Sequence, residues 1–169
     1  MWILRSVAYR QGKTTEPDVE LLESAGRLDL GYLEVLLCIT EAAVAWRAGA
    51  YEVGRKAAAR ACERAPSAGA RSPAFPLARA LGAACGEQLP VTEVLDLAAA
   101  AMEGAVPRVG LQTLALLARV HRDIAPQWTA AAADLARRSH IEESSRHVRL
   151  EVLSLNETLD ALGAKLFNQ

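Results

Sequence analysis

The chain has 169 residues, of which 51% are hydrophobic but only 5% aromatic. A chain of this length buries roughly two-thirds of its unfolded surface, so its stability does not require a disulfide or a metal ion. Ala and Leu dominate the apolar content, and both favour helix over strand. The formal net charge of −1 argues against a polyanionic partner, so we expect no binding to nucleic acid.

The first 31 residues are expected to form an irregular N-terminal cap. Residues 1–11 fit a short helix or an edge strand, and Pro17 suits the first turn of a helix that ends near Gly26. The N-terminal apolar stretch is too short for a signal peptide. No apolar run reaches the roughly 20 residues that cross a bilayer. We therefore expect a soluble, cytoplasmic protein without a membrane partner.

Residues 32–66 carry the clearest pattern. Apolar residues recur at steps of three and four from Tyr32 to Trp46, which predicts a helix that Gly49 ends. Leu33 and Leu37 lie off that stripe, so we expect the helix to be covered on two sides. A second helix starts near Tyr51 and stops at Pro66. Small residues form its inner side, and the outward-facing residues include Arg60 and Arg64.

The rest of the chain reads as further helices. Residues 67–76 form a Ser-, Gly- and Pro-rich loop, helices follow from Leu77 to Gly86 and from Pro90 to Gly104, and Pro107 lies in the break. A third pair covers 109–123 and 126–138, and a long helix over 144–167 caps the end. The sequence therefore predicts an all-α single domain of seven to nine helices. Residues 32–138 form three antiparallel pairs, because short connections make neighbouring helices antiparallel.

One helix pair matches a known repeat. Gly49-Ala50-Tyr51-Glu52, followed by small residues and Pro66, resembles the second half of a tetratricopeptide (TPR) repeat, and Leu81-Gly82 resembles that family's Leu-Gly pair. The resemblance implies stacked helical hairpins, an α-solenoid in which neighbouring repeats share one core. Irregular repeats of this kind are similar to the helical regions of large bacterial regulators. A compact helical bundle without a superhelix is the alternative.

No motif points to catalysis. Gly12-Lys13-Thr14 lacks the earlier glycine of a phosphate-binding loop, because Val7 stands in its place. His121, His140 and His147 show no metal-ligand spacing, and arginines lie close to each of them. We interpret Cys38, Cys62 and Cys85 as buried, reduced thiols. The sequence therefore predicts no enzyme, no metal site and no cofactor.

The TPR resemblance implies a concave binding surface lined by the first helix of each pair. It assigns six residues to that surface: Trp46, Arg47, Arg79, Glu87, Arg119 and Arg122. Trp and Arg are enriched at binding hot spots. We therefore expect a protein-interaction or scaffolding module that holds a peptide or a partner helix. A helical domain that senses a small molecule is the alternative, and self-association also stays open.

Overall fold

The computed structural model describes residues 18–27, 31–65, 72–104 and 106–128, together with Ala132 and Leu135. All regular structure in these ranges is helical, which confirms the predicted all-α class. The chain divides into two compact units, Met1–Gln88 and Leu89–Gln169, called the N-terminal unit and the C-terminal unit below. The boundary falls between the two helices of the predicted second pair.

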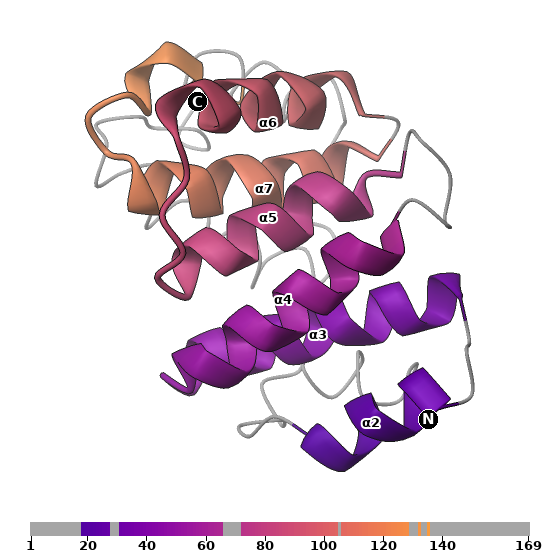
Figure 1. The fold of residues 1–169 in the computed structure, drawn as a ribbon. Helices are drawn as coiled ribbons and strands as arrows, with labels where there is room; N and C mark the ends of the chain where they lie inside the picture. The colour runs from indigo at the N-terminus through magenta and orange to yellow at the C-terminus, as the bar shows by residue number, and fades with distance from the viewer. Residues whose placement is uncertain are drawn as a thin grey trace, which may run out of the picture. The chain divides into compact units, whose positions relative to one another are not determined.

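The N-terminal unit contains α2 (Val19–Arg27), α3 (Tyr32–Arg47), α4 (Tyr51–Arg64) and α5 (Ala74–Ala84). Helix α3 packs against α2, α4 and α5, and α4 also packs against α5. As the ribbon shows, α3 and α5 run in one direction and α4 runs against both (Figure 1). Helix α3 is therefore the centre of this unit.

Small side chains set the distance between these helices. The residues buried in α4 are Gly54, Ala57, Ala58 and Ala61, which confirms the predicted inner side. At Gly54 an added Cβ would come within 2.5 Å of Cys85 Sγ and 3.5 Å of Ala42 O. A larger residue would require the Cys85 side chain or a helix to shift, because separations below 3.0 Å hardly occur for real Cβ atoms. Gly54 is thus a packing residue in this unit.

Helix α3 packs against three helices, so it is covered on more than one side as expected, although Leu33 does not contribute to that cover. Its buried hydrophobic residues include Leu37, while Leu33 near its first turn is 48% exposed. The same helix buries two glutamates, Glu34 and Glu41, completely. The apolar periodicity gave no indication of these buried charges.

The C-terminal unit contains α6 (Val91–Glu103) and α7 (Pro107–Val120), which pack against each other. Residues 126–128 are also helical, as are Ala132 and Leu135. At Gly110 of α7 an added Cβ would collide with the backbone carbonyl oxygen of Ala101 in α6. The backbones of α6 and α7 therefore lie close together at this point, because glycine has no side chain to separate them.

Prolines account for two of the helix boundaries that differ from the prediction. Helix α5 begins at Ala74, so Pro76 lies in its first turn and not in the preceding loop. Pro107 is the first residue of α7 and does not simply mark the break before it. Proline fits the first helical turn because the N–H that it lacks has no partner within the helix there.

Several other predictions remain untested. The long helix over 144–167, most of the helix over 126–138 and the segment 1–17 lie outside the described residues. The structure describes six helices, and neither the total of seven to nine nor the solenoid arrangement follows from them.

Candidate binding surface

The turn between α3 and α4 is built by Gly49, which adopts the left-handed region with φ of 73°. The Gly49 N–H donates to Trp46 O at 3.2 Å, and the Ala50 N–H donates to Ala45 O at 2.9 Å. These two hydrogen bonds define a Schellman motif, which favours glycine at this position. The turn holds the end of α3 close to the start of α4.

Large side chains flank this turn on both sides. Trp46 is half-buried and Arg47 is exposed, while Tyr51 is 51% exposed at the start of α4. Arg55 lies one helical turn after Tyr51 and is also exposed. We call these four residues, Trp46, Arg47, Tyr51 and Arg55, the α3–α4 tip. Sequence analysis missed Tyr51 as a surface residue because the TPR resemblance assigned it only to the start of the helix.

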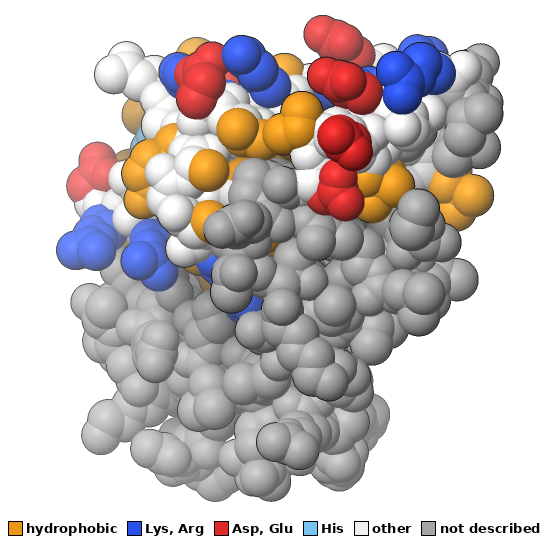
Figure 2. Space-filling model, turned by 90° about the horizontal axis from the view of Figure 1, so that it is seen from below, with side chains coloured by type: hydrophobic (Ala, Val, Ile, Leu, Met, Phe, Trp, Pro, Cys, Tyr) orange, Lys and Arg blue, Asp and Glu red, His pale blue; other side chains and the backbone are white. Residues whose placement is uncertain are grey.

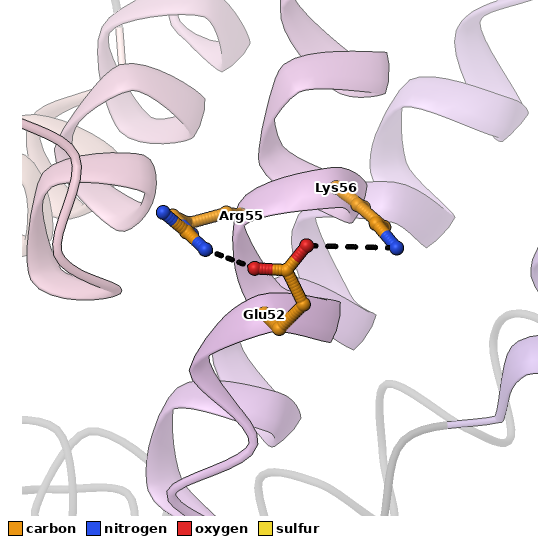
Figure 3. A network of polar contacts seen from close by, with 3 residues as sticks. All are labelled: Glu52, Arg55 and Lys56. Atoms are coloured by element: carbon orange, nitrogen blue, oxygen red, sulfur yellow. Dashed lines mark hydrogen bonds and ion pairs between the residues drawn. The ribbon is translucent and has the colours of Figure 1, made fainter.

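Arg55 connects the α3–α4 tip to a polar network on α4. Arg55 donates a hydrogen bond to Glu52 Oε2, and Lys56 Nζ lies 3.5 Å from Glu52 Oε1. The two basic side chains reach the carboxylate from opposite sides (Figure 3). The hydrogen bond from Arg55 and its charge, with a smaller contribution from Lys56, lower the pKa of Glu52. The network keeps Glu52 ionised, and its exposed ion pairs contribute little to stability.

The molecular surface carries both signs of charge. In the view from below, acidic and basic side chains lie next to one another on the described part of the chain, with hydrophobic side chains between them (Figure 2).

Arg79 and Glu87, two of the predicted binding residues, contact each other. Arg79 Nη1 lies 2.5 Å from Glu87 Oε1. Gly86, with φ of 96°, forms a second Schellman turn after α5, in which the Glu87 N–H donates to Gly82 O at 3.0 Å. An added Cβ at Gly82 would collide with Glu87 Oε2. The Leu-Gly match thus marks the place where the Glu87 carboxylate lies against α5.

The remaining predicted binding residues lie in the C-terminal unit. Arg119 is in the last turn of α7 and Arg122 is in the turn that follows, and both are exposed. Trp46, Arg47, Arg79 and Glu87 all belong to the N-terminal unit. A single concave surface that contains all six residues stays a prediction.

A buried ion pair connects α3 with α4. Arg60 Nε lies 2.8 Å from Glu34 Oε1, and Arg64 Nε lies 3.6 Å from Glu34 Oε2. The Glu34 side chain is fully buried, whereas Arg60 and Arg64 are 30% and 44% exposed. The prediction that Arg60 simply faces outward was wrong, because the carboxylate beneath it draws the guanidinium inward.

The second buried carboxylate contacts the start of α2. Glu41 Oε2 accepts a hydrogen bond from the Asp18 N–H at 2.6 Å, and Asp18 Oδ1 accepts one from the Leu21 N–H at 2.9 Å. Asp18 is therefore the N-cap of α2. The only sequence signal for these acids is their spacing of seven residues, Glu34 to Glu41, in an otherwise apolar helix.

The three cysteines form no disulfide bond. Cys38 and Cys85 are buried and Cys62 is half-buried, so the predicted burial is confirmed for two of the three. Burial raises the pKa of both Cys38 and Cys85 to about 11. Low-pKa thiolates are the reactive form of cysteine, so these two thiols have the character of packing residues. Among the described residues, no group of three or more His, Cys, Asp or Glu side chains could hold a metal ion.

None of the described helices is both long enough and apolar enough to cross a membrane. Comparisons with protein-family models, with curated proteins and with solved structures find no match to this chain.

Proposed function

We propose that the N-terminal unit is a protein-interaction module and that the α3–α4 tip anchors its partner, a peptide or a helix. The observation that carries this proposal is the position of Trp46, Arg47 and Tyr51 on either side of one hydrogen-bonded glycine turn. Trp, Tyr and Arg are the residue types that dominate binding hot spots. The glycine turn supports the proposal further, because a preorganised surface loses less conformational entropy on binding.

The TPR-like stacked-hairpin architecture is part of the same proposal. Helix α5 packs on both α3 and α4 and runs parallel to α3. This is the arrangement expected when a second hairpin begins to stack on a first. Close packing at Gly54 supports this proposal, because the repeats that the chain resembles have small residues where their helices meet.

The test compares two double variants, each of which truncates two exposed side chains of the N-terminal unit. Arg47→Ala/Tyr51→Ala removes two side chains of the α3–α4 tip, while Tyr32→Ala/Leu33→Ala removes exposed side chains at the opposite end of α3. Proteins captured from native lysate by the wild-type chain are identified, and their affinities are then measured with purified components.

The proposal expects the tip variant to bind at least about tenfold more weakly, since truncation of a hot-spot residue costs roughly 2 kcal/mol or more. The control variant should bind as the wild type does. Circular dichroism confirms that both variants keep their helix content. Equal binding by both variants, or the failure of the wild type to capture any protein, would refute the proposal.

A further inference from the structure

Helix α2 joins the N-terminal unit mainly through α3. It has nine residues, and helices shorter than about 12 residues are rarely stable alone in water. Among its side chains that the structure describes, none is buried: Val19, Glu20, Glu23 and Arg27 are exposed, and Leu21 and Ser24 are half-buried. The helical form of α2 therefore depends on contacts with α3.

The carboxylate of Glu41 on α3 holds the start of this helix. Its Oε2 atom accepts a hydrogen bond from the N–H of Asp18, the N-cap of α2, at 2.6 Å. A negative charge at a helix N-terminus stabilises the helix through its macrodipole, and the effect is larger in partly buried positions. Glu41 is fully buried, so it stabilises the helical form of α2 together with its contact to α3.

The same carboxylate makes this contact easier to open than an apolar one. Burial removes water from a charged group, and the cost of that burial is recovered when the group returns to solvent. The other helices of the unit do not need α2 to hold them together, because α3, α4 and α5 pack against one another directly.

We propose that α2 is a releasable strap, which folds onto α3 and unfolds from it while α3, α4 and α5 stay packed, and that Glu41 holds it in place. Release uncovers the side of α3 on which α2 lies and exposes the Glu41 carboxylate to water. Such a local opening needs less free energy than global unfolding. The strap is independent of the α3–α4 tip and its partner.

Amide hydrogen exchange of the full chain, followed residue by residue with nuclear magnetic resonance, tests this proposal. In the wild type we expect the amides of α2 to be at least about tenfold less protected than those of α4, because the strap opens without the rest of the unit. Low denaturant concentrations should accelerate exchange in α4 but hardly in α2, since release of α2 exposes little surface. Equal protection of α2 and α4 would overturn the proposal, because α2 would then open only with the whole unit.

Two variants with the same change of charge test the role of Glu41. Glu41→Gln keeps the shape of the side chain, but it replaces a charge-assisted hydrogen bond by a neutral one of about half the strength. We expect the exchange rate of α2 relative to α4 to rise about tenfold further. Glu63→Gln, at an exposed position of α4, should leave this ratio unchanged. An unchanged ratio in Glu41→Gln would overturn the role of Glu41, and the wild-type measurement tests the strap even if that variant fails to fold.

Discussion

The two units bury different kinds of groups between their helices. The N-terminal unit buries the carboxylates of Glu34 and Glu41. In the described part of the C-terminal unit no charged side chain is buried, and the buried Thr113 hydroxyl donates to Val109 O in its own helix. The helices of the first unit are therefore connected partly by ion pairs and hydrogen bonds of buried carboxylates. In the second unit α6 and α7 approach each other closely at Gly110.

This difference determines which substitutions each unit tolerates. A side chain that is crowded by another side chain can be accommodated if the neighbour moves or is made smaller. Crowding by a backbone carbonyl cannot be relieved in this way. A buried charge depends on its partner, because leaving it unpaired is more costly than removing the whole pair.

The largest effect is expected at Gly110. Gly110→Ala places a methyl group against the Ala101 carbonyl oxygen and should destabilise the C-terminal unit by about 3 kcal/mol or more, despite the roughly 1 kcal/mol gain in helix propensity. Chemical denaturation of the full chain measures the change. Adding Ala101→Gly should not rescue the variant, because the obstacle is backbone. A neutral or stabilising Gly110→Ala would show that α6 and α7 are farther apart than described.

A somewhat smaller effect is expected when Arg60 is replaced. Arg60→Ala leaves the buried Glu34 carboxylate with only the longer contact to Arg64, and breaking a buried pair in this way costs about 3 kcal/mol. Glu34→Leu in the same chain should recover much of that loss, because an apolar pair then replaces the charged one. If the double variant is less stable than Arg60→Ala alone, Glu34 has a second stabilising role.

Gly54 offers the direct contrast with Gly110. Gly54→Ala should cost about 1–3 kcal/mol by overpacking against Cys85 Sγ, partly offset by better helix propensity. In a Cys85→Ala background the same substitution should become neutral or stabilising, since the crowded sulfur is gone. The free energies of unfolding of the wild type, the two single variants and the double variant give the coupling energy. Strict additivity would contradict the described contact.

The smallest effect concerns the buried thiols of the N-terminal unit. The pKa of Cys38 and of Cys85 is raised from 9.0 to about 11, chiefly by burial. In the unfolded chain these thiols ionise first, so their contribution to stability is complete below pH 9 and is lost as the pH rises toward 11. Stability measured from pH 8 to pH 11 should therefore fall less steeply in Cys38→Ala than in the wild type. Equal slopes would show that Cys38 ionises alike in both states.

Sequence patterns alone determined much of this architecture. Apolar periodicity located α3, α4 and α6, because three- and four-residue spacing gives a helix one continuous buried side. Gly49 and Gly86 ended their helices as expected, since a left-handed residue at the end of a helix favours glycine. The starts of α5 and α7 were missed, because a proline both breaks a preceding helix and fits the first turn of the next.

Only the tertiary structure determined which charged residues are buried and which of them form pairs. No sequence rule distinguishes Glu34, which is fully buried, from Glu52, which is exposed, because their difference depends on which helix lies opposite. The same holds for Arg79 and Glu87, which pair across a turn that the sequence located but whose side-chain contacts it could not specify. Local propensity determined where the helices lie in the chain, whereas long-range packing determined which polar groups meet, because such contacts join residues that the sequence keeps apart.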